Sequence, residues 1–274
     1  MKTSSSSLFH FKTKFEYLQN IIEKGFEFRP CQEELPPLGY RKSIFYGHDA
    51  IKYIQIPLIV CFCDLPLCMS QDHRNQYGEY AIAMTKQWGM MNKVTPIRYI
   101  HENSPGFEGE TYNKMLDLPS HLIEHDNNIF HLLAYILKER GNIKAPSEED
   151  FEKLPEGMKN VLEMANLEFN RVLSHWHEVM NYVRKYEGDW VDRVSGNITH
   201  RIFYEEREWR AATNEKDAKL TFTFRDITHL IVNTEKERNI LGDQIIKRSR
   251  DLEVEDEKII WSKIHIGEDL YGDI

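Results

Sequence analysis

The sequence predicts an α+β fold in which one mixed β-sheet is combined with a helical insertion. Short strand-like runs flank helical patterns at both ends of the chain, an arrangement typical of that class. Between them, residues 104–190 carry mainly helical periodicity. We therefore expect residues 1–103 and 191–274 to form the two halves of one α+β core, with residues 104–190 as a helical subdomain.

The N-terminal segment predicts a strand followed by a helix. Residues 8–11 form a short, aromatic-rich strand candidate, and Thr13 is the expected N-cap of a helix whose apolar residues share one face. Gly25 is the expected C-terminal stop of this helix. Residues 29–50 contain three prolines and two glycines without periodicity, which predicts a loop.

Three more strands are predicted before residue 104. Residues 56–63 are almost continuously apolar, the pattern of a central strand buried on both faces. A short helix through about Tyr77 follows, and residues 80–84 form the next strand. Thr85 is the expected cap of a short helix, and residues 96–100 are the expected third strand.

The middle of the chain is expected to be helical. Apolar residues between 129 and 137 recur at helical spacing, and this helix is expected to end at Gly141. Residues 144–157 hold two prolines and several acids, which predicts a linker. A long amphipathic stripe over residues 162–183 predicts a second helix.

The C-terminal part returns to strands. We expect strands over residues 201–212, 220–224 and 229–233, an amphipathic helix over residues 235–248, and a last strand over residues 258–265.

Composition restricts the classes of protein that the chain can belong to. It has 274 residues, with 35 basic against 44 acidic side chains and a net charge of −9, which disfavours broad charge-driven binding to nucleic acid. Four cysteines in this length are not a disulfide framework, and Cys61 and Cys63 on one strand suit a reducing compartment. Because neither a signal peptide nor an apolar run of membrane length is present, we expect a soluble, cytoplasmic protein.

His10 is the first candidate for chemistry. It lies between Phe9 and Phe11 in the predicted strand, so its side chain should point to the opposite face from both aromatic rings. A histidine there can hydrogen-bond a ribose or a backbone carbonyl. The alternative is an ordinary histidine at a sheet surface.

A run of charged residues in the predicted strand 201–212 is the second candidate. In a strand Glu206, Glu208 and Arg210 project to one face, whereas Arg207 and Trp209 project to the other. Two carboxylates so close repel each other, so the pKa of one should rise unless Arg210 offsets it. Such a pair can orient a ribose hydroxyl, stabilise a cationic sugar-like transition state or act as a general base. The alternative is a solvated strand face held by salt bridges.

Asp64, His73 and Tyr77 form the third group. His73 and Tyr77 are four residues apart, so a helix places them on one face, where core packing is the alternative. For Asp64 the alternative is a helix cap. An aromatic ring at Tyr77 or Tyr80 would suit stacking on nicotinamide or adenine.

No metal site is expected, although Cys61, Cys63, Cys68 and His73 are suitable residue types. Cys-x-Cys on a strand is not a chelating turn, because tetrahedral sites use Cys-x-x-Cys knuckles. The dinucleotide-binding, Walker, nucleophile-elbow and His-Glu-x-x-His motifs are absent from the sequence. Their absence excludes the commonest classes of NTPase, Rossmann enzyme, hydrolase and metalloprotease.

Four segments in this order resemble a bacterial family. They are Leu-Phe-His-Phe at 8–11 with its Ile-Ile-Glu-Lys-Gly-Phe helix end, Cys-Phe-Cys-Asp-Leu-Pro-Leu at 61–67 with His73 and Tyr77-Gly78, residues 81–89 ending in Trp-Gly, and Glu-x-Glu-Trp-Arg at 206–210. Together they resemble the AbiGi family of abortive phage-infection proteins, described as antitoxins. The resemblance implies phage defence or a toxin–antitoxin pair, with a toxin or an antitoxin as partner.

A more distant resemblance is to ADP-ribosyltransferase-like toxins, including those that modify DNA. It implies an ADP-ribosyltransferase-like sheet with an NAD-binding cleft. By position, His10 would hold the NAD ribose and Tyr77 or Tyr80 would stack on nicotinamide. Glu208 or Glu206 would stabilise the oxocarbenium ion at the scissile bond. The Ser-Thr-Ser strand of these enzymes has no clear counterpart in this sequence.

The same resemblance makes Arg210 an expected phosphate ligand and adds His73 and Asp64 to the residues expected around NAD. ADP-ribose would be transferred to a nucleic-acid or protein target. The alternative function is a non-catalytic antitoxin whose acidic surface occupies the basic site of a partner toxin. No membrane partner is expected.

Overall fold

The computed structural model describes residues 4–30, 58–101, 152–191, 196–249 and 253–271. The chain divides into two compact units, residues 1–32, 56–99 and 186–274 in the first and residues 33–55 and 100–185 in the second. The predicted loop over residues 29–50 and the predicted helix over residues 129–141 lie almost entirely outside the described residues.

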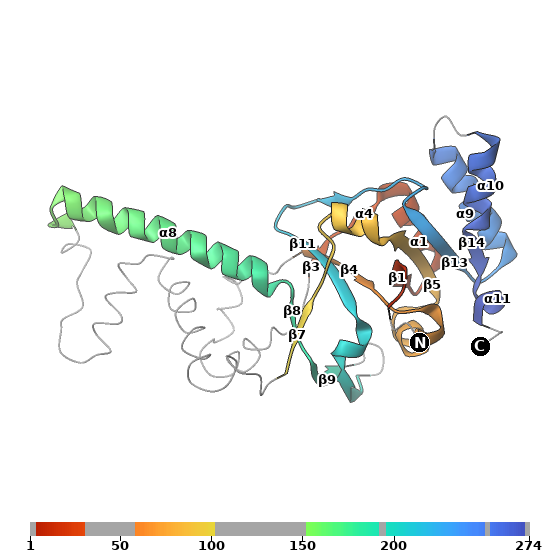
Figure 1. Cartoon of the computed structure of the whole chain (residues 1–274), viewed down its shortest axis with the longest axis horizontal. Coiled ribbons are helices and arrows are strands. Elements are labelled where there is room, and N and C mark those ends of the chain that lie inside the picture. The colour runs from red at the N-terminus through yellow and green to blue at the C-terminus, as the bar shows by residue number, and fades with distance from the viewer. Residues whose placement is uncertain (1–3, 31–57, 102–151, 192–195, 250–252, 272–274) are drawn as a thin grey trace. The chain divides into compact units, whose positions relative to one another are not determined.

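The first unit is built on a mixed sheet, as the α+β prediction requires (Figure 1). Its eight described strands run in the order β14-β13-β5-β1-β4-β11-β6, with β3 paired to β4. All described pairs in this sheet are antiparallel except β13 with β14. The strands are β1 (Ser7–Lys12), β3 (Arg29–Pro30), β4 (Leu58–Cys63), β5 (Tyr80–Thr85), β6 (Thr95–Pro96), β11 (Glu208–Thr213), β13 (Ile227–Val232) and β14 (Ile264–Ile266).

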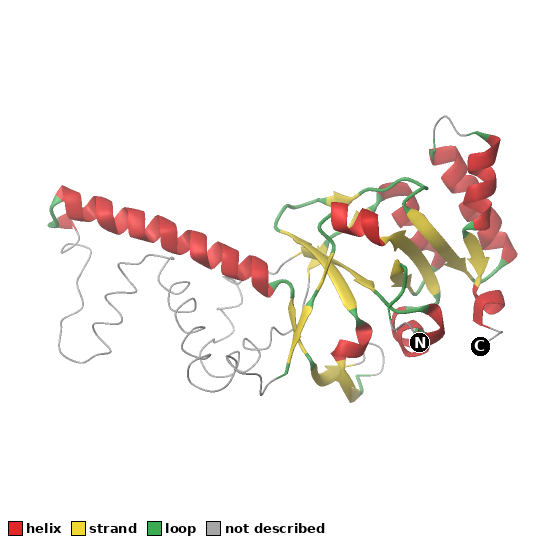
Figure 2. Ribbon diagram, in the orientation of Figure 1, coloured by secondary structure: helices red, strands yellow, loops and turns green. Residues whose placement is uncertain are grey.

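Helices and short strands complete the described elements, and Figure 2 separates the helices, in red, from the strands, in yellow. In the first unit these are α1 (Phe15–Lys24), β2 (Phe26–Glu27), η2 (Leu67–Met69), α3 (Gln71–Tyr77), α4 (Lys86–Met91), β9 (Glu187–Val191), β10 (Ile198–Ile202), η3 (Phe203–Glu206), β12 (Lys219–Leu220), α9 (Glu235–Arg248), α10 (Val254–Ser262) and α11 (Gly267–Tyr271). Strand β7 is Arg98–Ile100, and the second unit contains α8 (Glu156–Met180) and β8 (Val183–Lys185).

The sheet is split between β1 and β4. These strands share one antiparallel pair, Phe9 with Cys63, whereas β1 pairs with β5 at six positions and β4 pairs with β11 at six. We therefore distinguish a first half-sheet, β14-β13-β5-β1, from a second half-sheet formed by β4, β11, β6 and β3.

Each face of the sheet has its own apolar core. The α1 face is the larger, and its buried residues pack with α1, α4 and α9; they include Leu8, Leu18, Phe62, Ile82, Met84, Trp88 and Leu241. The opposite α3 face is smaller and includes Phe9, Phe11, Cys63, Ala81, Ala83 and Ile231, with Tyr77 and Leu270 packed against it. Burial of this apolar surface is the main force holding the unit together.

Most of the regular elements confirm the sequence predictions, because their signals are local. Helix α9 has the predicted bounds, and Thr234 and Glu237 form a capping box at its start. Thr85 caps α4 by accepting a hydrogen bond from the backbone N–H of Trp88 at 3.1 Å. Gly25 ends α1 with a φ of 82°, but the N-cap is Lys14 rather than Thr13.

Two predicted strands near the C-terminus are wrong in part. Residues 201–212 divide into the end of β10, the η3 turn and β11, because Arg207 adopts the left-handed conformation with φ 45° and ψ 51°. Residues 258–265 are mostly helix α10, followed by β14. An acidic first turn and a capping box between Glu253 and Asp256 favour that helix.

Three smaller differences concern element ends. Val183 lies in β8 and not in the predicted long helix, which ends at Met180. The predicted strand over residues 96–100 is divided between β6 and β7, and that over residues 220–224 is reduced to β12. None of the described helices combines the length and the apolar composition needed to cross a membrane.

Candidate functional site

His10 lies where the two half-sheets separate. Its Nδ1 is 2.7 Å from the carbonyl oxygen of Cys61, and because a carbonyl only accepts, Nδ1 carries the proton. The ring packs against Phe26 and Phe62, with centroids 5.3 and 5.4 Å away, on the face opposite Phe9 and Phe11, as the alternation predicts. Burial, followed by the nearby Lys12 charge, lowers the pKa of His10 to about 3. At neutral pH the imidazole is therefore neutral, and Nε2 is a hydrogen-bond acceptor.

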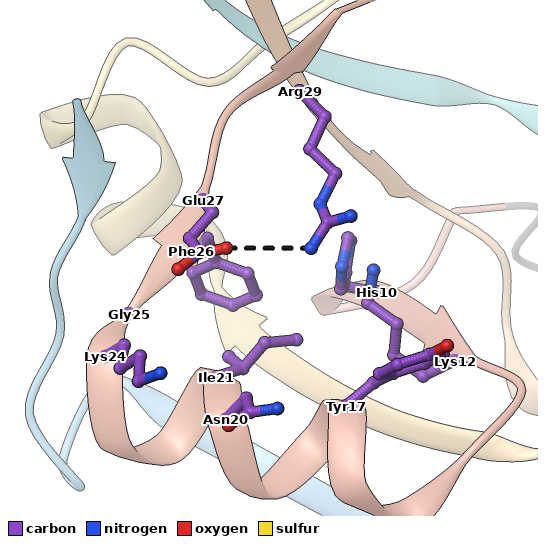
Figure 3. A pocket seen from close by; sticks show the side chains of 10 residues that line it. All are labelled: His10, Lys12, Tyr17, Asn20, Ile21, Lys24, Gly25, Phe26, Glu27 and Arg29. Carbon is purple, nitrogen blue, oxygen red and sulfur yellow. Dashed lines mark ion pairs between the residues drawn. The ribbon is translucent and has the colours of Figure 1, made fainter. Parts of the chain in front are cut away.

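A cavity of about 300 Å³ opens beside His10, between β1, α1 and the β2–β3 segment (Figure 3). Three cationic side chains line it, Lys12, Lys24 and Arg29, against one carboxylate, that of Glu27. Glu27 lies 3.6 Å from Arg29 and 3.4 Å from Lys219, so its charge is shared. The cavity is therefore cationic, although the chain has a net charge of −9.

Lys12 is the most unusual of these cations. Burial is the main cause that lowers the pKa of Lys12, and the charge of Arg29 adds to the lowering. Among the residues that the structure describes, no carboxylate forms an ion pair with Lys12. An anion bound between Lys12 and Arg29 would relieve their repulsion, so the cavity is suited to a phosphate or carboxylate.

On the α3 face, three predicted residues come together. The His73 ring lies 4.4 Å from that of Tyr77 and 5.3 Å from that of Phe11, consistent with one helix face. The Tyr77 hydroxyl lies 3.4 Å from both carboxylate oxygens of Glu206. This cluster lies on the α3 face, and none of its residues lines the cavity, which opens on the α1 face.

Glu208 and Arg210 form a buried ion pair on the α3 face. Glu208 pairs with Cys63 and Arg210 with Cys61 across β4, which fixes the face to which both point. Glu208 Oε1 lies 2.8 Å from both Nε and Nη2 of Arg210, and the two side chains are 6% and 2% exposed. The predicted offset of one carboxylate by Arg210 is present, whereas Glu206 is carried by η3 and does not continue this strand face.

Asp64 has a structural position at the end of β4. Its carboxylate accepts hydrogen bonds from the Ser4 hydroxyl, the Ser5 backbone N–H and the Lys86 ammonium. The shortest donor–acceptor distance is 2.8 Å in all three cases. It is not a helix cap, because Pro66 and Ser70 are at the cap positions of η2 and α3. Asp64 thus anchors the N-terminal segment to β4.

Tyr80 is also engaged elsewhere. It lies on the α1 face, opposite Lys12 in the β1–β5 ladder, and its hydroxyl donates to Glu237 of α9 at 2.9 Å. Burial raises the pKa of Tyr80, and the bond to Glu237 adds to this. Tyr80 therefore ties α9 to β5, whereas Tyr77 packs on the opposite, α3 face.

The sequence analysis missed the cavity cations. Lys12 follows His10 by two residues in a strand, so period-2 alternation was a signal that both side chains share a face. Arg29 comes from β3, whose pairing with β4 is a long-range feature without a local signal. In the described part of the chain, no group of three histidine, cysteine or acidic side chains is placed to hold a metal ion.

The fold and the site define an α+β protein with a split mixed sheet and a cationic cavity at the split. Comparison with known proteins identifies the family. Residues 29–240 match the family described as "Putative abortive phage resistance protein AbiGi, antitoxin", and the chain belongs to this family. The abortive phage resistance protein AbiGi of Lactococcus lactis subsp. cremoris is 24% identical in an alignment of 260 residues. The match covers 86% of this chain and 98% of that protein. No solved structure matches.

The family membership confirms the predicted resemblance to AbiGi and places the chain among abortive phage-resistance proteins. The resemblance to ADP-ribosyltransferases stays a prediction.

Proposed function

We propose that this phage-resistance protein binds NAD in the cavity at the split and transfers ADP-ribose to an acceptor. The observation that supports the proposal most is the cationic cavity beside the neutral, half-buried His10, in a chain that is acidic overall. Its volume of about 300 Å³ is within the range of small-molecule sites.

The cavity residues have distinct roles in this proposal. Lys12 and Arg29 bind the pyrophosphate, since both are cations and Lys12 has no ion-pair partner among the described residues. His10 accepts a hydrogen bond from a ribose hydroxyl through Nε2, while its Nδ1–H continues to donate to the Cys61 carbonyl. Arg210, expected to bind a phosphate, is replaced in this role because its guanidinium neutralises Glu208.

NAD supplies a glycosidic bond whose cleavage releases nicotinamide and leaves ADP-ribose for the acceptor. In the proposal, Glu206 stabilises the positive charge that develops on the ribose and then takes the proton of the attacking acceptor group. Glu206 is preferred to Glu208 because it is only half-buried, whereas Glu208 is buried and pairs with Arg210. Tyr77 positions the Glu206 carboxylate and offers its ring to nicotinamide.

Calorimetric titration with NAD tests binding. Binding of NAD to the wild type should give a measurable heat. His10→Ala and Lys12→Met should weaken the affinity for NAD roughly tenfold or more. Lys258→Met removes an exposed lysine on α10 and should leave this affinity unchanged. Glu206→Gln should bind NAD normally but produce no nicotinamide. Absence of heat in the wild type, or nicotinamide release by Glu206→Gln at the wild-type rate, would contradict the proposal.

A second candidate is a non-catalytic antitoxin, which the family description and the net charge of −9 favour. In that case an acidic surface of this chain binds the basic site of a partner toxin. The tagged chain would then purify with the toxin in a fixed stoichiometry, and Glu206→Gln would neutralise the toxin as well as the wild type does.

A further inference from the structure

Close to Glu206, three tyrosines form an aromatic cluster that the proposed chemistry does not use. The Tyr204 ring lies 5.4 Å from that of Tyr186 with a 22° angle between the planes, and 5.5 Å from that of Tyr99 at 80°. The arrangement is therefore one stacked and one edge-to-face pair, both of which are favourable geometries for aromatic rings. We call Tyr99, Tyr186, Tyr204 and Arg207 the tyrosine platform.

The backbone holds this platform in place. Tyr204 is in the η3 turn, which is anchored in the core by the buried Phe203. The Tyr204 N–H donates to the Tyr186 carbonyl at 3.1 Å, and the Arg207 N–H donates to the Tyr204 carbonyl at 3.2 Å. The Tyr99 hydroxyl accepts a bond from the Glu208 N–H at 2.9 Å, which ties the cluster to β11.

Tyr204 is nevertheless 45% exposed, which is high for an aromatic ring packed between two others. The left-handed conformation of Arg207, with φ 45°, brings its guanidinium to 5.9 Å from the Tyr204 ring. A planar cation and a tyrosine ring, both accessible to solvent, are the side chains on which nucleobases stack in single-stranded nucleic acids.

Several acidic side chains are among the described residues next to the platform. Glu187 and Asp189 lie 3.6 and 3.5 Å from His200 on the neighbouring hairpin, and Glu205 is exposed beside Tyr204. Recognition would thus depend on stacking of a base more than on attraction of a phosphate backbone. This is consistent with the net charge of −9.

We propose that the tyrosine platform stacks an unpaired nucleobase, so that the acceptor of the proposed ADP-ribose transfer is a single-stranded nucleic acid. The inference rests on the proposed function, because Tyr204 and Glu206 lie on the same η3 turn and a base held there reaches the proposed reacting centre.

Fluorescence anisotropy with labelled 12-nucleotide single strands of DNA and of RNA, and with a duplex, tests the platform. The wild type should bind the single strands more tightly than the duplex. Tyr204→Leu keeps an apolar side chain but removes the stacking face, and should weaken binding about fivefold or more. Tyr204→Trp should retain binding, and Arg207→Ala should weaken it. Preference for one single strand would identify the sugar that is recognised.

Arg225 offers a matched control, because its guanidinium lies 5.5 Å from the Phe224 ring, away from η3. Arg225→Ala removes one cation stacked on an aromatic ring and should leave oligonucleotide affinity within about twofold of the wild type, a difference too small to reflect a lost stacking contact. NAD titration of Tyr204→Leu should give the wild-type affinity, so that loss of the platform and failure of the NAD site are distinguishable. Wild-type oligonucleotide affinity in Tyr204→Leu, or no binding of any single strand by the wild type, would overturn the inference.

Discussion

The two faces of the sheet hold cationic side chains in opposite electrostatic environments. In the cavity, Lys12 and Arg29 repel each other across open space, whereas on the α3 face Glu208 and Arg210 neutralise each other in a buried pair. A charge without a buried partner can bind a ligand, and a charge that is paired and buried contributes to the integrity of the fold. Residue type alone therefore did not distinguish binding residues from structural ones.

The largest expected effect concerns the buried pair. Arg210→Met would remove an ion-pair partner of the buried Glu208, Arg210 itself, and should lower the free energy of unfolding by about 3–5 kcal/mol, measured by urea denaturation. The double variant Glu208→Leu/Arg210→Met should recover most of this loss. Removing one partner of the exposed Glu255–Lys258 pair is the control and should change stability by less than about 1 kcal/mol. A loss for Arg210→Met as small as that of the control would contradict the structural role.

On the other face of the sheet, Lys12→Met should not lower the free energy of unfolding. Removing a desolvated cation that has no ion pair among the described residues should leave the free energy of unfolding unchanged or raise it. The affinity for NAD should nevertheless fall about tenfold or more. If the same variant lowered the free energy of unfolding by several kcal/mol, Lys12 would be a residue that stabilises the fold and not a ligand-binding residue.

Acidification should destabilise the protein through its half-buried histidines. The pKa of His10 falls from 6.5 to about 3 on folding, so between these values the unfolded chain binds a proton that the folded chain does not. Stability is therefore present above pH 6.5 and is lost as the pH falls through this window, by up to about 1.4 kcal/mol per pH unit for one histidine. Burial also lowers the pKa of His229 and His265, which adds to the same slope.

Thermal or urea denaturation from pH 7 to pH 4 measures this slope. His10→Gln should reduce it, and His200→Gln, at an exposed position, serves as the comparison. An unchanged slope in His10→Gln would show that His10 is protonated in the folded state.

The smallest expected effect is that of Tyr77→Phe. The hydroxyl lies 3.4 Å from the Glu206 oxygens, long for a hydrogen bond, so its removal should lower the free energy of unfolding by less than about 1 kcal/mol. Nicotinamide release should fall more than stability does, because Tyr77 positions Glu206 in the proposed site. Equal and large losses of both would instead indicate that Tyr77 is a core residue.

The fold was predictable where the signal was local. Strand alternation located His10, the apolar run located β4, and a capping residue with a periodic stripe gave the bounds of α9. The prediction was wrong over most of residues 258–265, because the apolar run there fits a helix face as well as a strand. The acidic capping box at the start of α10 favours the helix.

The arrangement of the site was less predictable, because long-range contacts determine it. The sheet is split because β1 and β4 share only one described residue pair, Phe9 with Cys63. Arg29 reaches the cavity because β3 pairs with β4. The contacts of Asp64 with Ser4 and of Tyr80 with Glu237 join residues far apart in the sequence. No spacing rule indicates such partners.

The pairing of β4 with β11 has a consequence for how the family can vary. These strands close a loop over all the chain between Cys63 and Glu208, including the whole part of the second unit that follows residue 99. The entropy of closing a flexible loop grows only with the logarithm of its length, about 0.6 kcal/mol for each doubling. Relatives can therefore lengthen or shorten the part of this segment between residues 100 and 185 at small thermodynamic expense, while β4 and β11 keep their register.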